Sequence, residues 1–226
     1  MVKEPSPPPT AAPLTAEPGD DTESKILDAA HAVFMRSGTA GARMQEIADE
    51  AGVNKALLHY YFRSKERLAA AVFDRVARGL FARVGQLAMS EVELEEKVRL
   101  IIAAYLDQFA RTPYAPGYLI CEMNQHPDRA GQLLTALGGS TTVSRGPAMP
   151  FLAGLAQQIE QRVAAGRMRP IEPRQFLANL VSLCVFPFAA RPMLCAVFRM
   201  DDGGFREFIE ERKTSLPSFF LNALRP

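Results

Sequence analysis

Residues 44–67 read MQEIADEAGVNKALLHYYFRSKER, and this stretch decides how the 226-residue chain folds. Apolar residues at positions i, i+3, i+4 and i+7 predict a helix with one buried stripe, made of Met44, Ile47, Ala48 and Ala51. Gly52 can adopt the left-handed backbone of a C-terminal cap, and Asn54 can then cap the start of a second helix. Three apolar residues of the second segment are spaced to pack back on the first helix: Val53, Leu58 and Phe62. The stretch therefore predicts a helix-turn-helix.

The second of these helices carries aromatic and basic side chains on the faces that its packing residues leave free. They belong to Lys55, Ala56, His59 and Tyr60, with Leu57 and Tyr61 beside them. Tyr and His can hydrogen bond with phosphates and base edges, while Ala and Leu can contact the thymine methyl group. We interpret this helix as one that enters a groove of double-stranded DNA.

The charge around the turn indicates the same partner. Residues 52–67 hold one acid, Glu66, and four bases, a local excess of three positive charges in a chain of net charge +1: Lys55, Arg63, Lys65 and Arg67. A polyanion would dock where this charge is concentrated. The alternative is a plain helical hairpin with a solvated basic face. Because the turn, the core spacing and the aromatic face agree, we favour the DNA-binding interpretation.

Residues 24–68 resemble the DNA-binding domain of TetR-type bacterial repressors. The matching stretches are SKILDAAHAVFMRSG and MQEIADEAGVNKALLHYYFRSKERL. The usual family pattern has a Gly-Val-Ser turn, a Leu-Tyr-x-aromatic-Phe helix and a Ser-Lys-Glu start to the next helix. This chain has Gly-Val-Asn, Leu-His-Tyr-Tyr-Phe and Ser-Lys-Glu in those places. The resemblance covers residues 24–68 of 226, and beyond them it extends only to length and helical character.

The resemblance implies roles for individual residues. It implies that Gln45 reads a base edge, and that Arg43 and Met44 contact phosphate. In the second helix it implies base reading by Lys55 and His59, with Asn54 and Ala56 near bases. It implies contacts with the DNA backbone by Leu57, Tyr61 and Lys65. Two residues depart from the family pattern, His59 for the commoner Tyr and Leu57 for a Thr or small residue, and both bear on the operator sequence.

Composition limits the class of protein. A chain of this length suits one domain or two small ones, and its hydrophobic content of 48% is ordinary for a globular protein. Its 26 basic residues are balanced by 25 acidic ones, so DNA binding should be local and specific rather than that of a polycation. The three cysteines form neither a disulfide framework nor a metal-binding pattern, which predicts a cytoplasmic protein with no metal and no cofactor.

Two segments need separate interpretation. Residues 1–20 contain six prolines, which predicts a disordered or extended tail. The alternative, an arm that reaches into the minor groove, is disfavoured because Lys3 is its one basic residue. Residues 176–190 are almost wholly apolar, but fifteen residues are short of the ~20 that cross a bilayer. We therefore expect a buried helix and no membrane association.

The remainder predicts an all-α fold. Helices are expected at residues 22–37, 65–86, 91–111, 118–125, 129–137, 151–165, 174–198 and 205–224, with a flexible loop at 138–150. Prolines should bend the helix 174–198 at Pro187 and Pro192 and break the last helix at Pro217. We expect a tail at 1–20, a DNA-binding domain at 21–67 and a domain for effector binding and dimerisation at 68–226.

Two of these helices are candidates for a homodimer interface, since two copies of a helix-turn-helix can read a near-palindrome. Their apolar stripes would form a four-helix bundle with the symmetry mate. The stripes are Leu152, Leu155, Ile159 and Val163 in the first helix, and Phe176, Leu180, Leu183 and Cys184 in the second. The alternative is that these residues belong to the core of one chain.

Residues 91–137 are then free to enclose a small, largely apolar effector, because they combine apolar bulk with scattered polar groups. The candidate contacts are Tyr105, Gln108, Phe109, Tyr114, Tyr118, Cys121, Met123, Asn124 and His126. The alternative is that the methionine and the aromatic residues are core. Cys121 is either a sensor of electrophiles or a small buried hydrophobe.

These expectations combine into a ligand-relieved repressor that acts as a homodimer on a palindromic operator. In the mechanism that the resemblance implies, the effector displaces the helix that begins at Lys65 and separates the two recognition helices. The alternatives are a DNA-binding protein without an effector, or an α-helical enzyme. Catalytic and nucleotide-binding motifs are absent from the sequence, and the acids Glu93, Glu95 and Glu96 are interpreted as a solvated first turn of a helix.

Overall fold

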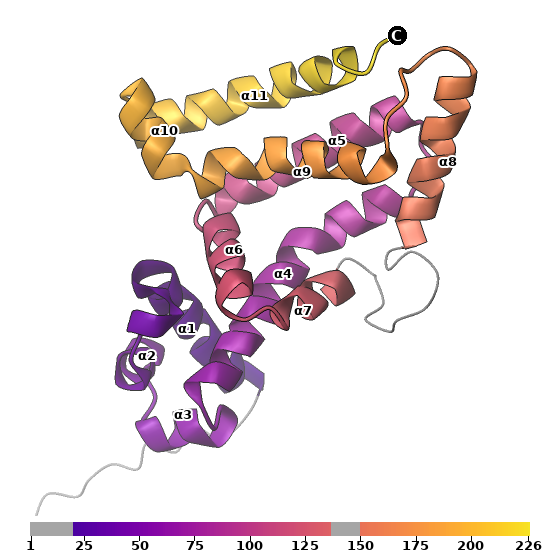
Figure 1. The fold of residues 1–226 in the computed structure, drawn as a ribbon. Coiled ribbons are helices and arrows are strands. Elements are labelled where there is room, and N and C mark those ends of the chain that lie inside the picture. Colours follow the sequence, from indigo (N-terminus) through magenta and orange to yellow (C-terminus); the bar gives the residue numbers. More distant parts are fainter. Residues whose placement is uncertain (1–19, 137–149) are drawn as a thin grey trace, which may run out of the picture.

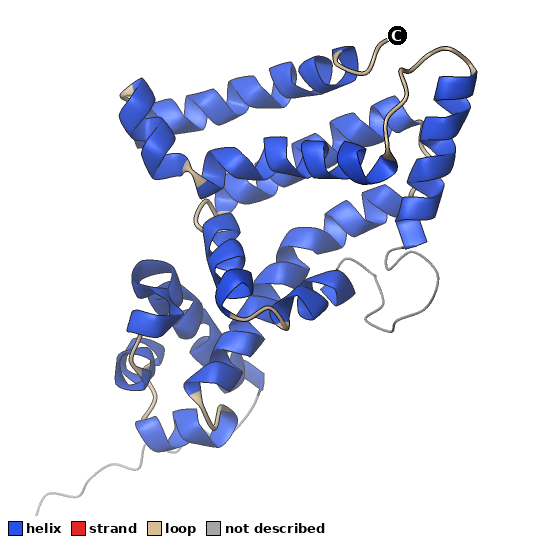
Figure 2. Ribbon diagram, viewed as in Figure 1, coloured by secondary structure: helices blue, strands red, loops and turns tan. Residues whose placement is uncertain are grey.

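The computed structural model describes residues 20–136 and 150–226, and this part of the chain is helical without strands (Figures 1 and 2). The all-α fold class is confirmed. Apart from Asp20 and Pro150, the predicted tail at 1–20 and the predicted loop at 138–150 lie outside the described residues. The helices are α1 (Asp20–Gly41), α2 (Met44–Ala51), α3 (Lys55–Tyr61), α4 (Lys65–Met89), α5 (Leu94–Arg111), α6 (Ala115–Gln125), α7 (Arg129–Ala136), α8 (Pro150–Ala164), α9 (Pro173–Ala189), α10 (Arg191–Phe198) and α11 (Asp202–Asn222).

The helices form a small lobe and a large lobe joined by α4 (Figure 1). Helices α1, α2 and α3 make the small lobe, and α4 runs from it into the large one. In the large lobe α5 packs against α4, α9 and α11, while α8 contacts α4, α5 and α9. Helix α6 contacts α1, α4 and α9, so it lies where the two lobes meet. A change in α6 or α4 is therefore placed to reach the small lobe.

A row of aromatic rings links the helices of the large lobe. Phe81 of α4 lies edge-on to Tyr105 of α5, whose ring is 5.4 Å from that of Phe109. Phe109 in turn contacts Phe188 of α9 at 5.2 Å, and Phe188 contacts Phe205 of α11 at 5.7 Å. Edge-to-face ring pairs add to the burial of apolar area. The row therefore fixes α4, α5, α9 and α11 relative to one another.

Proline positions correct two predicted helices. The predicted helix 174–198 is two helices, α9 and α10, with an angle of 70° between them. Pro192 lies in the first turn of α10, where proline costs no hydrogen bond, and Pro187 remains inside α9. The predicted break at Pro217 is wrong, because α11 continues through that buried residue.

Other helix limits differ from expectation by a few residues. Helix α5 begins three residues later than predicted, and α6 begins earlier because Pro116 stands in its first turn. Gly38, the predicted end of the first helix, has φ 66° and ψ 162°, which puts a kink there, and helical turns continue to Gly41. Among the described residues no single helix is long and apolar enough to cross a bilayer. The bent pair α9 and α10 meets that criterion by length and composition alone.

A buried ion pair fastens α6 and α7 over α4. Glu122 of α6 pairs with Arg129 of α7, and both side chains are almost fully buried. The Arg129 guanidinium also lies over the ring of Phe73 in α4, 5.7 Å from its centre. Burial lowers the pKa of Arg129. Losing one partner of such a pair would leave a buried charge without compensation.

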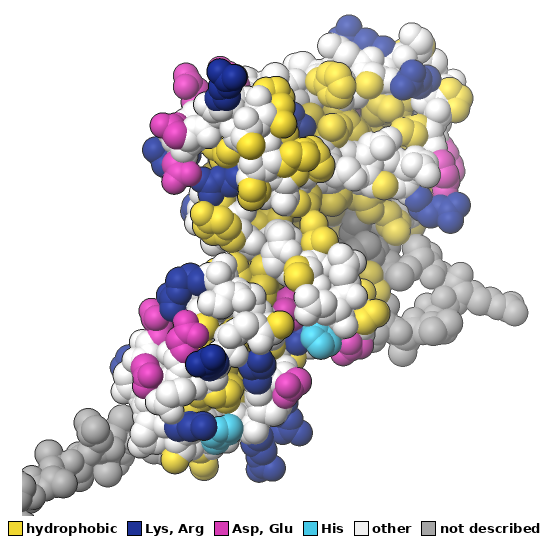
Figure 3. All heavy atoms as spheres, turned by 60° about the vertical axis from the view of Figure 1, so that its left-hand side comes forward, with side chains coloured by type: hydrophobic (Ala, Val, Ile, Leu, Met, Phe, Trp, Pro, Cys, Tyr) yellow, Lys and Arg dark blue, Asp and Glu magenta, His cyan; other side chains and the backbone are white. Residues whose placement is uncertain are grey.

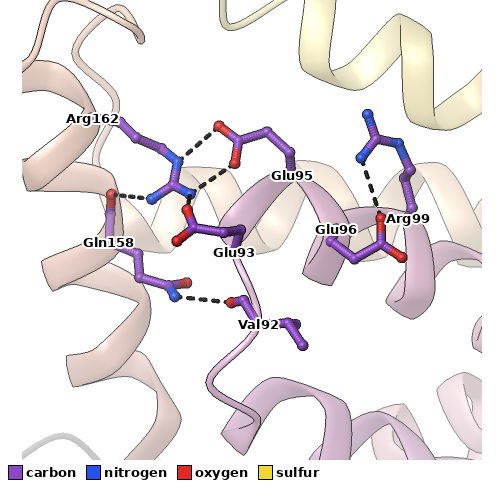
Figure 4. Close-up of polar contacts among 7 residues, drawn as sticks. All are labelled: Val92, Glu93, Glu95, Glu96, Arg99, Gln158 and Arg162. Atoms are coloured by element: carbon purple, nitrogen blue, oxygen red, sulfur yellow. Dashed lines mark hydrogen bonds and ion pairs between the residues drawn. The ribbon is translucent and has the colours of Figure 1, made fainter.

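A second ion-pair cluster joins α8 to the start of α5 (Figure 4). Arg162 of α8 donates two hydrogen bonds to the Glu95 carboxylate, at 2.8 and 2.7 Å, and one of 2.5 Å to Glu93. The Arg162 side chain is only 3% exposed, so its charge depends on these partners. The Glu93 and Glu95 side chains are 78% and 40% exposed at the start of α5, as a solvated first turn predicts, but both also pair with Arg162, which the sequence did not show. Glu96 pairs with Arg99 at 3.4 Å, and both side chains are exposed.

Candidate nucleic-acid interface

The turn between α2 and α3 has the geometry that the sequence predicts. Gly52 is left-handed, with φ 66° and ψ 29°, and its N–H caps the end of α2 on the carbonyls of Ala48 and Asp49. The side-chain oxygen of Asn54 accepts a hydrogen bond of 2.8 Å from the Leu57 N–H, which caps α3. Both predicted caps are confirmed, and they set the angle at which α3 leaves α2.

One face of α3 is fixed against the small lobe. Leu58 is fully buried and Phe62 nearly so, while Val53 is half-buried against the same core. That core includes Ile47 and Ala48 of α2, both fully buried. A two-turn helix is not stable alone, so this packing holds α3 in place.

The opposite face of α3 is open to solvent. The side chains of Lys55, Ala56, His59 and Tyr60 are exposed, and Tyr60 is 71% exposed. Leu57 and Tyr61 are half-buried at the border of this face. The rings of Tyr60 and Tyr61 meet edge to face with 5.5 Å between their centres. We call Lys55, Ala56, His59 and Tyr60 the α3 face.

The other predicted DNA contacts lie just before α2 and in its first turn. Arg43 stands exposed at the N-cap position of α2 and makes no side-chain cap bond there. Met44 is half-buried, and Gln45 is exposed with its amide donating to the Asp49 carboxylate at 2.8 Å. The Gln45 amide is thus hydrogen-bonded within α2, and a contact with a base would have to compete with this bond.

Lys65 has contacts within the small lobe that sequence reasoning missed. Its ammonium donates to the carbonyl oxygens of Ala40 and Ala42, at 3.1 and 3.2 Å. It therefore ties the start of α4 to the turn between α1 and α2. Ser64 caps α4 by accepting a hydrogen bond from the Arg67 N–H. The sequence showed the Ser64-Lys65 pair but not the partners of Lys65, because the Ala40 and Ala42 carbonyls lie more than twenty residues before it.

Arg36 of α1 is a further positioning residue that the sequence did not single out. Its guanidinium is 2.9 Å from the Glu50 carboxylate and 3.6 Å from that of Glu46, both in α2. The hydrogen bond that Arg36 donates to the Glu50 carboxylate raises the pKa of the guanidinium. The acids stand four residues apart on one helix side, but nothing in the sequence showed which base they face.

The surface around the α3 face is basic. Arg43, Lys55, Arg63 and Arg67 are exposed, and Figure 3 shows Lys and Arg side chains around the end of the small lobe. Helix α3 spans seven residues, and the major groove of DNA admits an α-helix. The arrangement can offer charged and ring donors to phosphates and bases. Among the described residues no group of three or more His, Cys, Asp or Glu could hold a metal ion.

The predicted effector contacts do not converge on one cavity. Tyr105 and Phe109 are buried in the aromatic row, and burial raises the pKa of Tyr105. Gln108 lines a cavity of about 210 Å³ together with residues of α1 and α4. The half-buried Met123 and His126 and the exposed Asn124 are not among the residues that line this cavity or the two described next.

The other predicted contacts line two cavities nearer the α9–α10 junction. Tyr118, Cys121 and Tyr114 border one of about 340 Å³, and Tyr114 also borders one of about 430 Å³. Tyr118 is nearly buried, which raises the pKa of its hydroxyl, whereas Cys121 is exposed. The alternative of a small buried hydrophobe is therefore wrong for Cys121.

The predicted dimer stripes lie mainly in the core of one chain. Five of their eight residues are buried within the chain, namely Leu155, Ile159, Phe176, Leu180 and Cys184, while Leu152, Val163 and Leu183 are half-buried. Because other residues of the same chain already cover these side chains, they offer little surface to a partner chain. This favours the alternative that they belong to the core of one chain. Exposed apolar side chains occur instead elsewhere on α9, α10 and α11: Phe186, Met193, Val197, Phe198 and Phe219.

Comparison with known sequences identifies related regulators. Residues 26–72 match the sequence model of the family described as bacterial regulatory proteins, tetR family. The HTH-type transcriptional repressor NicS of Pseudomonas putida is 32% identical over 129 residues, which cover 56% of this chain and 60% of NicS. The HTH-type transcriptional activator FasR of Mycolicibacterium smegmatis is 36% identical over 90 residues, 40% of this chain and 41% of FasR. The similarity thus spans less than two thirds of either relative.

Comparison with solved structures concerns the fold. A ketosteroid transcriptional regulator of Mycobacterium tuberculosis superposes with a TM-score of 0.63 at 13% sequence identity. The superposition covers 92% of this chain and 97% of that protein. The helical architecture is therefore shared over nearly the whole chain at low sequence identity.

Proposed function

Because this chain belongs to the TetR family of bacterial regulatory proteins, we propose that it binds a DNA operator as a homodimer and acts as a ligand-relieved repressor of transcription. In this proposal residues 21–67 bind DNA, and residues 68–226 bind the effector and dimerise. The boundary falls in the first turn of α4, so the two parts share a helix. The protein would act in the cytoplasm, where its operator lies.

One observation carries the DNA-binding part of the proposal. The α3 face is exposed to solvent while Leu58 and Phe62 fix the back of the same helix in the core. Exposed Lys, His and Tyr side chains on a rigid short helix match what base and phosphate contacts require. We assign Arg43 and Gln45, which are exposed at the start of α2, to the same DNA-binding surface.

The homodimer follows from the size of the reading element and from the surface of the large lobe. A seven-residue helix reads only a few base pairs, whereas two copies read a symmetric site with half-sites about one helical turn or more apart. Phe186, Met193, Val197, Phe198 and Phe219 expose large apolar side chains on α9–α11. Exposed large apolar side chains of this kind are typical of an interface, and we propose that the dimer contact involves them.

Ligand relief is supported by how the lobes are connected. Helix α4 belongs to both lobes, and α6 contacts α1, α4 and α9. A small, largely apolar effector that binds more tightly to one arrangement of these helices would change the distance between the two α3 faces of the dimer. The coupling free energy between effector binding and operator binding would be ~1–3 kcal/mol. The relatives include a repressor and an activator, so similarity alone does not decide between the two, and repression is part of the proposal.

The test is selection of binding sites from a random duplex library by the full chain without effector. The proposal predicts enrichment of a near-palindrome, and two chains per selected duplex by analytical ultracentrifugation. Lys55→Ala should abolish the enrichment, and Arg225→Ala, which removes the same charge at the exposed C-terminus, should not. Enrichment of no sequence would contradict the DNA-binding proposal, and an asymmetric site bound by one chain would contradict the homodimer.

A further inference from the structure

The waist between the lobes holds two adjoining cavities. The inner one, of about 340 Å³, lies between the last turns of α1, helix α6 and the junction of α9 with α10. The outer one, of about 430 Å³, lies between the start of α6 and α11. They share Tyr114, Phe188 and Arg191, so these residues form the wall between them. Figure 3 shows hydrophobic side chains at this waist. The inner cavity has the volume of a small-molecule site.

Arg191 is the cation of this wall, and its surroundings are unusual. Its side chain is only 14% exposed, with the guanidinium 5.4 Å from the ring centre of Tyr114 and 4.9 Å from that of Phe205. Its counter-ion is Asp202 at 2.7 Å, whose side chain is 83% exposed. Asp202 can return to water at little cost, whereas Arg191 stays buried and requires an anion. The pair is therefore arranged for exchange of one carboxylate for another.

The other residues of the inner cavity favour an apolar body for the incoming anion. Phe34, Met35 and Phe188 contribute apolar wall. Glu122 also lines the cavity, but its carboxylate is buried and paired with Arg129, so it is compensated. Thr39, Tyr118 and Gln125 add neutral polar groups to the lining, and Arg191 is its cation. A cavity with one cation that can change its partner and a partly apolar wall selects an apolar carboxylate over a neutral molecule of the same shape.

We propose that the inner cavity binds a small apolar carboxylate whose oxygens replace those of Asp202 on Arg191. Gly38 and Thr39 of α1 line the same cavity as Gly117 of α6, so the occupant contacts both lobes. The kink at Gly38 is the point where the end of α1 can turn when the cavity fills. This inference rests on the proposed function and names its effector class: occupation shifts the small lobe and lowers affinity for the operator.

The first experiment measures ligand binding without DNA. The full chain is titrated by calorimetry with 2-naphthoate and with 2-naphthylmethanol, which lacks the charge. The proposal predicts that 2-naphthoate binds at least about tenfold more tightly, and that Arg191→Gln removes this preference while changing the affinity for the alcohol by less than about threefold. No binding of 2-naphthoate, equal binding of the two probes, or binding unaffected by Arg191→Gln would overturn the proposal.

A second variant keeps the proposal testable if Arg191→Gln fails to fold. Asp202→Asn removes the competing carboxylate and leaves Arg191 in place, so 2-naphthoate should bind several-fold more tightly. Glu207→Gln removes a different exposed acid of α11 and should have no effect. Unchanged or weaker binding by Asp202→Asn would overturn the exchange at Arg191.

Cys121 reports whether the probe occupies this cavity. It lines the inner cavity and is exposed, so saturating 2-naphthoate should slow its alkylation by iodoacetamide, while Cys195 of α10 keeps its rate. An unchanged rate at Cys121 would place the probe elsewhere and overturn the assignment. Operator binding by the ligand-free chain tests the proposed function separately. With that binding intact, failure of 2-naphthoate to bind would overturn this inference alone, and retention of the operator at saturating probe would contradict the coupling.

Discussion

The side-chain oxygen of Asn54 accepts a 2.8 Å hydrogen bond from the backbone N–H of Leu57, and this contact closes the first turn of α3. Because α3 has only seven residues, removing the cap should loosen the whole helix. Asn54→Ala is expected to lower the free energy of unfolding by about 1 kcal/mol, and Asn54→Ser to keep most of it, since Ser also caps helices. Urea unfolding followed by circular dichroism measures both. An Ala variant as stable as the original chain would contradict the role of the cap.

Lys65→Met tests the tie between α4 and the turn after α1. The carbonyls of Ala40 and Ala42 would lose their donor, so stability should fall, and binding to every duplex should weaken about equally. If Lys65 also contacts phosphate, the slope of log K against log salt should fall by about 0.9. Arg67→Met, at a neighbouring exposed position, is the control for charge alone. An unchanged slope would show that Lys65 acts only through the turn.

The Arg162 cluster predicts a loss of stability in acid. The hydrogen bonds from Arg162 are the main cause that holds the pKa of Glu95 below its ordinary value of 4.5. A carboxyl with a depressed folded-state pKa stabilises fully above its unfolded value, and that stability is lost as the pH falls through the folded value. The free energy of unfolding should therefore decline as the pH falls below about 4.5, and less steeply in Glu95→Gln.

At neutral pH the same variant should be destabilised by about 1 kcal/mol, an estimate reduced because the Glu95 side chain is 40% exposed. Glu96→Gln is the matched control, since its partner Arg99 lies at 3.4 Å on the exposed side of the helix. Denaturant unfolding at several pH values gives both quantities. Equal pH dependence in the original chain and Glu95→Gln would contradict the account of this cluster.

Cysteine reactivity should follow burial. Cys184 is fully buried in α9, and burial raises the pKa of its thiol to about 12, so almost no thiolate exists at pH 8. Cys121 is exposed. Iodoacetamide should therefore label Cys121 in the folded chain and Cys184 only after unfolding, as peptide mass spectrometry can show. Labelling of Cys184 at the rate of Cys121 would mean that α9 is not packed as described.

Local chemistry made the small lobe predictable from sequence. The cap at Asn54, the left-handed Gly52 and the stripe through Leu58 all act within a few residues, so their outcome depends little on the rest of the chain. The helix limits of α2 and α3 followed from the same signals. That the α3 face is exposed followed from the spacing of the residues that anchor the opposite side.

The large lobe was less predictable because its residues depend on distant partners. An apolar stripe shows that a helix face is buried, but not whether a partner chain or its own chain covers it. For Phe176 and Leu180 the cover is the same chain, and the exposed side of α9 instead presents Phe186. In the same way, nothing near Glu93 and Glu95 in the sequence showed that Arg162, 67 or more residues away, would pair with them. The cavity wall at Arg191 depends on the corner between α9 and α10. The prolines predicted a bend in this helix, but not which distant residues the corner would bring beside Arg191.

The central claim is that the α3 face lies against the bases of an operator. The most direct test is titration of Lys55→Ala and His59→Ala against a selected operator and every single-base change in its half-site, with Arg225→Ala as control. The account predicts that each α3 variant loses ~1–3 kcal/mol of binding free energy and relaxes its preference at particular base pairs. Folded variants that keep the original affinity and the original base preferences would contradict it.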